Sequence, residues 1–538
     1  MPEKPSLNLV SCMEASAPAS PKRVENAPAA WTHWVLPSIA DVFFLVLLCI
    51  LVLSPASSGL LGDADTGWHI RNGEQILATH SVPRVDSFSY TKGGEAWYAW
   101  EWLYDAGIGA IHKLSGLNGV VLFTGIVIAG TFALLFRFVL RRSGNFVVAA
   151  SLTLLAAAAA QVHMLARPHV LTWLFTLLWV EILYRFNEGG RRILLWLPLL
   201  MLLWVNVHGG FILGLVLLGV CGVAQVWNHL TAPRDDDFER GSFLALVFSV
   251  CLAVTLLTPY GYKLHVHVYE YLSNGFLMNS INEFMSPNFH ASGFGYFEML
   301  ILLVILGSVL GSDGITAFDL LLLLFSIHAG LYAARNIPIS ALLISLALGR
   351  PLSSVFSPQY CRMVQARWLS ALRESVHAFS MDMMAMEERF RGHGIALIAL
   401  VLCAATVLNG GRIFSVQVVD AHFSEQTFPV KAAEFIAQKG IRDHIFNPDD
   451  WSGYLIYRLY PGTKLYFDDR HDFYGEAFIK EYLKAAHSSW QWREPLEKYE
   501  VKWVLIPSDS PLASVLKESG KWSVEYDDRL AIVFYRCR

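Results

Sequence analysis

The sequence predicts an α-helical polytopic membrane protein of about 11 spans with a C-terminal soluble α/β domain. Of its 538 residues, 54% are hydrophobic and only 16% are charged, whereas soluble globular proteins carry about 25% charged residues. Long apolar runs recur between residues 35 and 408. From residue 414 onward the chain loses this apolar character, and the remaining stretch is long enough to fold as a separate domain.

The apolar runs divide the membrane part into successive spans. Residues 193–230 are too long for one span, and the polar motif Asn206-Val-His208-Gly-Gly divides them into two spans joined by a hairpin. In chain order, the predicted spans are 35–53, 120–140, 146–165, 170–186, the two halves of 193–230, 243–257, 297–310, 320–333, 335–348 and 395–408.

Basic residues predict the orientation of the chain. Arginines cluster after the second, fourth, sixth and tenth predicted spans, as at 141–142 and 191–192. By the positive-inside rule, these loops and the N-terminus face the cytoplasm, and the C-terminal domain lies outside. We therefore expect a bacterial inner-membrane protein with three parts: a disordered cytoplasmic tail (1–34), a transmembrane domain (35–413) and an extracytoplasmic domain (414–538).

A polar loop follows the first span at residues 56–118, and it is far longer than ordinary connections. Its tryptophans and a helix-like run near residues 97–112 argue against disorder. We interpret it as an active or binding loop, although the tryptophans alone would also suit an interfacial belt. Its polar residues include Asp63, Asp65, His69, Arg71 and Glu101.

Other polar residues stand at the predicted outer ends of later spans. Ionisable side chains beside spans are costly and tend to face a cavity or one another. Snorkelling arginines or helix caps would explain each one singly, but their shared side of the membrane favours a polar pocket. These residues are Arg167, His169, His208, Glu283 and Arg335.

The last domain is predicted to have helices at 430–439 and 511–518 and strands at 464–467, 502–506 and 530–535. Two polar runs in this domain, Asn447 to Tyr454 and Phe467 to Asp472, suit either ligand loops or Asx turns with an Asp–Arg pair on a solvated surface.

Several function classes are disfavoured. The net charge of −4 predicts no nucleic-acid partner, and the seven cysteines lack metal or disulfide spacing. The sequence contains no phosphate-binding Gly-rich loop, zinc His-Glu-x-x-His helix, nucleophile elbow or dinucleotide fingerprint. ATP-driven transport and the common hydrolase mechanisms are therefore not indicated.

The architecture resembles the GT-C superfamily, membrane glycosyltransferases that use polyprenyl-phosphate-linked sugars. Asp65-Thr-Gly-Trp68-His69-Ile-Arg71 is similar to the Asp-Pro-x-aromatic-Asn-aromatic-Arg pattern of oligosaccharyltransferase catalytic subunits. Thr66 replaces the proline and His69 the asparagine, so the acceptor class does not carry over. The pair Asp63-x-Asp65 is similar to the acidic pair of mannosyltransferase and aminoarabinose transferase branches. The chain also resembles a group of uncharacterised bacterial membrane proteins.

The resemblance implies roles for the acids. Sugar transfer from a lipid phosphate needs a carboxylate to orient or deprotonate the acceptor and cations to hold the departing phosphate. Asp65 is the expected base or the ligand of a divalent metal, Mg²⁺ or Mn²⁺, with Asp63 as its partner. A helix cap near Trp68 is the structural alternative for both.

The remaining polar residues are expected to bind substrate. Arg71 would contact phosphate, with a loop salt bridge as the alternative, and His69 would be a second base or a structural group. Glu101 would line the sugar site. The lipid phosphate would lie against Arg167, His169 and Arg335, while His208 and Glu283 would complete the pocket.

The leading hypothesis is an inverting GT-C glycosyltransferase that transfers a sugar from a polyprenyl-phosphate-linked donor in the lipid bilayer to an extracytoplasmic glycan, lipid or protein. The alternative is a non-catalytic transporter or assembly factor for lipid-linked glycans. Substitution of Asp65 separates the two, because an enzyme would lose turnover while keeping lipid binding.

Overall fold

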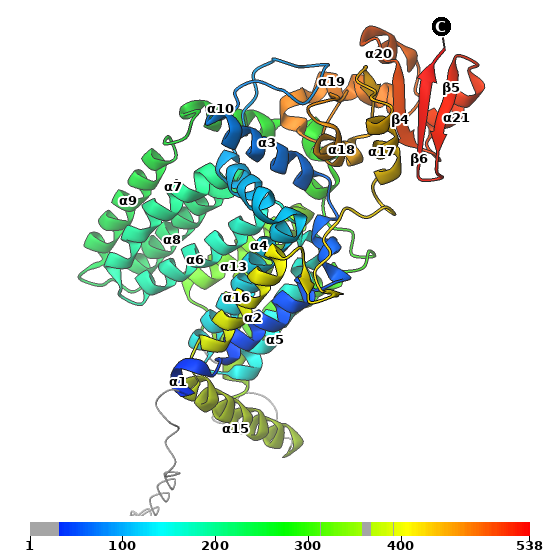
Figure 1. Ribbon diagram of the computed structural model, residues 1–538. Helices are drawn as coiled ribbons and strands as arrows, with labels where there is room; N and C mark the ends of the chain where they lie inside the picture. Colours follow the sequence, from blue (N-terminus) through cyan, green and yellow to red (C-terminus); the bar gives the residue numbers. More distant parts are fainter. Residues whose placement is uncertain (1–31, 312–313, 358–366, 391, 538) are drawn as a thin grey trace, which may run out of the picture.

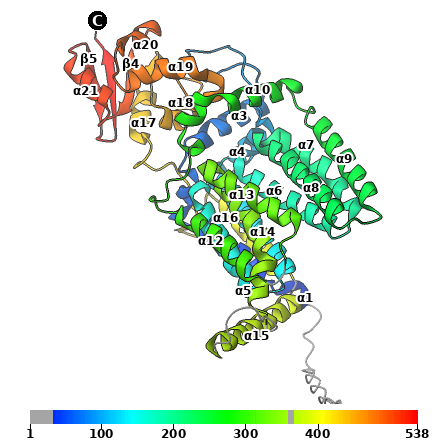
Figure 2. The ribbon, with the colours of Figure 1, turned by 180° about the vertical axis from the view of Figure 1, so that it is seen from behind.

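The structure is a computed structural model that describes residues 32–311, 314–357, 367–390 and 392–537. The disordered tail predicted for residues 1–34 lies almost wholly outside these residues. A helical bundle carries an α/β region at one end and the helix α15 (Arg367–Arg389) at the other, as both views show (Figures 1 and 2).

Each predicted span is occupied by a helix, which confirms the predicted fold class. Five helical segments of the described chain are long and apolar enough to cross a membrane, and four further apolar helices are shorter. The helices at the predicted spans are α2 (Ile39–Val52), α4 (Trp102–Ser143), α5 (Phe146–Ala160), α6 (His169–Asn187), α7 (Leu197–Val207), α8 (Ile212–Thr231), α9 (Asp237–Val254), α12 (Gly295–Leu310), α13 (Ala317–Tyr332), α14 (Ile337–Val355) and α16 (Gly394–Leu408).

The predicted division at Asn206 is also present. The short 3₁₀ helix η4 (Gly209–Phe211) separates α7 from α8. The Asn206 amide donates to the carbonyls of Leu202 (2.9 Å) and Leu257 (3.1 Å), and its oxygen accepts from the Trp102 indole (2.9 Å). These bonds satisfy a polar side chain at the break, where backbone groups also need partners.

The long first loop is largely helical. It contains α3 (Asp65–Thr79) and the first part of α4, which bends at Ser115 and Gly116 before the apolar part of the helix begins. A Cβ atom at Gly73 or Gly109 would clash with the backbone of the facing helix. The two glycines therefore allow α3 and α4 to pack backbone against backbone.

The C-terminal region has a four-stranded sheet in the order β3-β4-β6-β5, with β3 and β4 parallel and the other pairs antiparallel. The predicted helices at 430–439 and 511–518 and the strands at 502–506 and 530–535 are present within two residues. The elements are β3 (Ile445–Phe446), β4 (Trp503–Pro507), β5 (Trp522–Asp527), β6 (Ala531–Arg536), α17 (Val430–Gln438), α18 (Ser452–Leu459), α19 (His471–Ala486), α20 (Arg493–Lys498) and α21 (Pro511–Glu518).

The predicted strand at 464–467 is not a strand of this sheet. Leu465 instead donates to the carbonyl of Phe88 (3.0 Å) and accepts from the N–H of Tyr90 (3.0 Å), both in the first loop. It forms only isolated bridges, to Ser89 and Ile445. Backbone pairing between segments far apart in the sequence thus joins the first loop to the α/β region.

A second contact reinforces this junction. A Cβ atom at Gly67 of α3 would overlap the backbone of Gly453 in α18, and one at Gly453 would overlap Ala64. The Gly453 in the polar run Asn447 to Tyr454 thus permits close helix packing.

The remaining elements are short. They are α1 (Thr32–Val35), α10 (Tyr262–Ser273), α11 (Gly275–Ser280), β1 (Arg412–Ile413), β2 (Val416–Gln417) and the 3₁₀ helices η1 (Ala56–Leu61), η2 (Gln161–His163), η3 (Arg191–Trp196), η5 (Asn282–Phe284), η6 (Ala334–Asn336) and η7 (Asp449–Trp451).

Candidate active site

Five of the predicted residues form one ion-pair network, which we call the acid–arginine cluster: Asp63, Asp65, Arg167, Glu283 and Arg335. The Nη1 of Arg167 lies 3.0 Å from Oδ2 of Asp63, and its Nη2 pairs with Oδ2 of Asp65. Glu283 lies between the two cations, 3.9 Å from Nη1 of Arg167 and 3.4 Å from Nη1 of Arg335. Three carboxylates therefore surround two guanidinium groups.

The charged forms of Glu283 and Arg167 are stabilised by their neighbours in the cluster. Burial opposes ionisation of Glu283, but Arg335 and Arg167 lower the pKa of its carboxyl to about 2. Burial likewise opposes the charge on Arg167, yet Asp63 and Glu283 raise the pKa of its guanidinium. Side chains of the cluster remain between 12% and 30% exposed, so a ligand has access to them.

Short segments at helix ends position the cluster. Asp63 precedes α3 and its Oδ1 accepts the N–H of Asp65 at 2.8 Å, so one oxygen caps the helix start while the other binds Arg167. Arg167 stands in the turn before α6, Glu283 in η5, and Arg335 in η6. Capping and ion pairing therefore occur together at Asp63.

A second network is buried beside the cluster. Nδ1 of His69 bonds Oδ1 of Asp105 at 2.6 Å, and the amide of Asn72 donates to the other oxygen of Asp105 at 2.6 Å. Asp105 is fully buried. The contact between Gly73 and Gly109 brings α3 and α4 close enough for this bond.

Glu101 joins this network to the break between α7 and α8. Its Oε2 lies 3.8 Å from Nε2 of His69, and its Oε1 lies 3.5 Å from Nε2 of His208. The Gly210 N–H donates to Nδ1 of His208 at 3.0 Å, so neutral His208 carries its proton on Nε2, toward Glu101.

Burial shapes the charges of this second network. Burial, with the nearby charge of Asp105, raises the pKa of the Glu101 carboxyl well above its ordinary value. Burial and the charge of Arg167 lower the pKa of His69 well below its ordinary value. Both shifts favour the uncharged forms of Glu101 and His69, and an uncharged Glu101 can donate a hydrogen bond.

Two predicted residues lie outside these networks. Arg71 donates from Nε to the carbonyl of Tyr457 (2.8 Å) and pairs with Glu74 (2.5 Å), so it fastens α3 to α18. His169 donates from Nε2 to the carbonyl of His163 (2.8 Å). Arg71 thus makes the salt bridge that was the alternative to phosphate contact, and His169 stays next to Arg167 in the chain without joining its ion pairs.

Asp105 was missed as a site residue, although it lies four residues after Glu101, on the same face of a helix. Asp469 of the α/β region was missed as well. Burial and the neighbouring charge of Asp63 raise the pKa of Asp469 to about 7. The C-terminal region thus contributes an acid beside the cluster.

The Asp–Arg pair expected on a solvated surface of this region is buried instead. Arg470 is 4% exposed and pairs with Asp468 (2.7 Å) and with Asp86 of the first loop (2.6 Å). Its guanidinium also lies 4.5 Å from the centre of the Trp97 ring. The pair therefore belongs to the junction between the first loop and the α/β region.

The acids do not form a ready cation site. In the described part of the chain, no three His, Cys, Asp or Glu side chains lie together as metal ligands. Mg²⁺ and Mn²⁺ prefer several oxygen ligands in octahedral geometry, whereas Asp63 and Asp65 both bind Arg167. This donor set does not fit the expected divalent ion.

No family model and no curated protein matches the chain. Its fold is similar to that of solved oligosaccharyltransferases from Archaeoglobus fulgidus. One was solved with a tethered acceptor peptide (TM-score 0.52, 12% identity, 87% of this chain and 68% of that chain) and one in the apo form (TM-score 0.51, 11% identity, 87% and 68%). The third, AglB, was solved with an inhibitory peptide and a dolichol-phosphate (TM-score 0.54, 11% identity, 87% and 69%). The chain thus shares its overall fold with these oligosaccharyltransferases.

Proposed function

We propose that this protein is a membrane glycosyltransferase that moves a sugar from a polyprenyl-phosphate-linked donor to an extracytoplasmic acceptor. The observation that carries the proposal is the acid–arginine cluster, which combines two cations with acceptor-activating carboxylates at one end of the bundle. The shared fold supports it, because one similar structure holds a dolichol-phosphate and another an acceptor peptide.

Arg167 and Arg335 would hold the donor phosphate. Guanidinium groups bind phosphate oxygens through paired, charge-assisted hydrogen bonds. In the present structure carboxylates occupy these donors, so an incoming phosphate must displace them. When Arg167 turns to the phosphate, Asp65 loses its counter-charge and becomes a stronger base. Donor binding and base activation are then coupled.

The transfer is a single displacement. The acceptor atom attacks the anomeric carbon, its proton passes to Asp65, and a glycosidic bond forms. The bond from that carbon to the phosphate oxygen breaks, and the polyprenyl phosphate departs with the electron pair, held by Arg167 and Arg335. Attack opposite the leaving group inverts the configuration.

The second network would position the sugar. The His69 side chain is only 2% exposed, against 11% for Glu101, so Glu101 is the member that reaches a substrate. His69 and Asp105 act through it as positioning residues. A neutral Glu101 would donate a hydrogen bond to a sugar oxygen.

We further propose that arginine, rather than a divalent cation, supplies the positive charge at the phosphate. Turnover should then be unchanged by EDTA and by added Mg²⁺ or Mn²⁺. Loss of turnover in EDTA, with recovery when Mn²⁺ is added, would instead show that the reaction needs the divalent metal expected from the sequence.

The proposed location is a bacterial inner membrane, with the N-terminus cytoplasmic and the C-terminal region outside. Supporting this, the arginine-rich ends of α4 and α6 lie away from the cluster end of these helices. Single cysteines are introduced into α15 and α19 of a variant whose native cysteines, including the exposed Cys537, are replaced by serine. Labelling by an impermeant reagent in spheroplasts then tests the orientation, and only the α19 cysteine should react.

The non-catalytic alternative has one observation in its favour: Asp63 and Asp65 are both already paired with Arg167. The two functions differ in proteoliposomes supplied with polyprenyl-phosphate-linked hexoses. An enzyme releases polyprenyl phosphate as the sugar is transferred. A carrier moves or binds the intact donor and releases none.

A further inference from the structure

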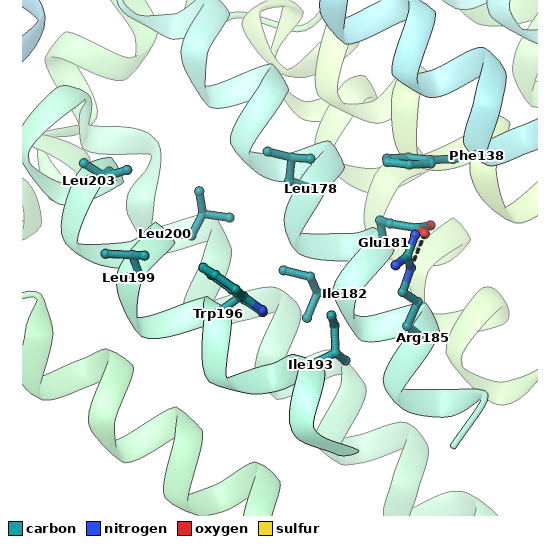
Figure 3. Close-up of a pocket in the computed structure, with 10 residues that line it drawn as sticks. All are labelled: Phe138, Leu178, Glu181, Ile182, Arg185, Ile193, Trp196, Leu199, Leu200 and Leu203. Atoms are coloured by element: carbon teal, nitrogen blue, oxygen red, sulfur yellow. Dashed lines mark hydrogen bonds and ion pairs between the residues drawn. The ribbon is translucent and has the colours of Figure 1, made fainter. Parts of the chain in front are cut away.

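A groove opens on the side of the bundle at the end away from the acid–arginine cluster (Figure 3). It lies between α6, η3 and α7, with one side chain from α4, and has a volume of about 330 Å³. That volume is within the range of small-ligand sites, about 300–1,000 Å³. From His169 near the cluster to Arg185 in the groove, α6 rises about 24 Å, most of a membrane thickness.

The upper part of the groove is apolar and open to the surroundings of the bundle. Leu178, Leu200 and Leu203 line it together with Trp196 (Figure 3). Trp196 is 61% exposed and Leu203 44% exposed, although both are large apolar side chains. In a membrane protein such a face contacts lipid chains, and an exposed tryptophan suits the membrane interface.

Charged groups form the other end of the groove. Glu181 is 4% exposed, and its Oε1 accepts from Nε of Arg185 and pairs with Nη1 of Arg141, each at 2.7 Å. Its Oε2 is buried without a hydrogen-bond partner among the described residues. A buried acceptor left unpaired costs free energy, so this atom favours a ligand that donates a hydrogen bond.

The surrounding charge favours a phosphate in the same ligand. Arg185 and Arg141 are 47% and 39% exposed, so their guanidinium groups can still meet a headgroup. The wider set of ion pairs contains four arginines and three carboxylates, a surplus of one positive charge: Arg141, Arg142, Arg185, Arg350, Glu181, Glu188 and Asp319.

We propose that this groove binds an amine-bearing phospholipid from the leaflet on this side of the membrane. An acyl chain lies along Leu178, Leu200 and Leu203, the phosphate meets Arg185 and Arg141, and the ammonium group donates to Oε2 of Glu181. A lipid with phosphate but no amine leaves Oε2 of Glu181 without a hydrogen-bond donor. The site is separate from the proposed transfer reaction and does not depend on it.

The test uses the full chain reconstituted with equal phosphatidylethanolamine and phosphatidylglycerol, extracted in mild detergent and weighed by native mass spectrometry. The wild type should retain one phosphatidylethanolamine in preference to phosphatidylglycerol by about tenfold, the value of one charge-assisted hydrogen bond. Glu181→Gln should bring that preference close to one. Leu200→Trp should fill the groove and remove both lipids.

A matched pair tests the phosphate contact. Arg185→Gln should lower retention of both lipids, whereas Arg234→Gln, in an exposed loop at the same end of the bundle, should leave retention unchanged. Gel filtration and thermal unfolding check that each variant is folded. The proposal is wrong if the wild type retains no more lipid than Leu200→Trp, if the two lipids are retained equally, or if Arg185→Gln and Arg234→Gln behave alike.

Discussion

The Nη1 atom of Arg167 lies 3.0 Å from Oδ2 of Asp63, across a separation of 104 residues in the chain. The other terminal nitrogen of Arg167 binds Asp65. One side chain from the turn before α6 thus holds both Asp63 and Asp65 of the first loop. This bidentate arrangement needs the planar fork of arginine.

Arg167→Lys should therefore keep the charge and lose the function. A single ammonium group can neither bridge Asp63 and Asp65 in the same geometry nor bind the incoming phosphate through two parallel hydrogen bonds. We expect turnover to fall about 100-fold, measured as release of polyprenyl phosphate. Arg84→Lys, in the first loop but bonded to the carbonyl of Pro259, is the control and should retain its rate. Equal turnover rates for the two variants would show that Arg167 has no role in the reaction.

The packing of α3 on α4 can be tested with two glycines of one helix. A Cβ atom at Gly109 would clash with the backbone of Gly73, whereas one at Gly107 would meet nothing within 4 Å. Gly109→Ala should destabilise the protein by about 1–3 kcal/mol. Gly107→Ala should be neutral or stabilising by up to about 1 kcal/mol because alanine favours helix.

Thermal unfolding in detergent measures both effects, and turnover of the surviving Gly109→Ala protein shows whether the bond between His69 and Asp105 depends on this contact. Similar unfolding midpoints for the two variants would show that the helices do not pack this closely.

Asp105→Asn tests the buried second network. The substitution keeps the shape of the side chain and replaces the carboxyl group, one oxygen of which holds Nδ1 of His69, by an amide. Loss of such a supporting contact typically lowers activity by about ten- to a hundredfold. We expect this decrease to appear in kcat, with KM unchanged. Asp443→Asn, an exposed acid, is the control. A rise in KM at constant kcat would place Asp105 in substrate binding instead.

His471 should make stability depend on pH. Burial opposes its charge, but the Asp449 carboxylate, 2.8 Å from Nε2, raises the pKa of His471 from 6.5 to about 9. A raised histidine pKa stabilises the folded state below pH 6.5, and this contribution disappears as the pH rises through 9. This contribution to the free energy of unfolding is about 3 kcal/mol at most.

Chemical unfolding of wild type and His471→Gln at several pH values measures this. The difference in free energy should be largest at pH 6 and small at pH 10. His422→Gln, at an exposed position, should show no such trend. A constant difference across this range would mean that the ion pair does not contribute.

Much of the bundle could be predicted because membrane helices are local in the sequence. The eleven apolar runs correspond to helices, and the break at Asn206 follows from the length of the run and its polar motif. Polar residues at span ends could be recognised as candidates because each is costly beside a bilayer.

Their partners could not be predicted in the same way. Arg71 matches the family pattern, yet it bonds Tyr457, 386 residues later. The segment at Leu465 resembles a strand, but it pairs with the first loop. Both outcomes depend on the α/β region contacting α3, and no local pattern encodes that contact. Gly67 and Gly453 make it sterically feasible, although either glycine alone would suggest only a turn or a flexible point.

The most direct test of the central claim is Asp65→Asn in proteoliposomes with a fluorescent polyprenyl-phosphate hexose. Donor binding and release of polyprenyl phosphate are measured on the same sample, with Asp443→Asn as the control. We predict that release falls at least about 100-fold, while the donor Kd changes by less than about threefold. Release at the wild-type rate, or loss of binding in parallel with release, would contradict a role for Asp65 in the transfer step.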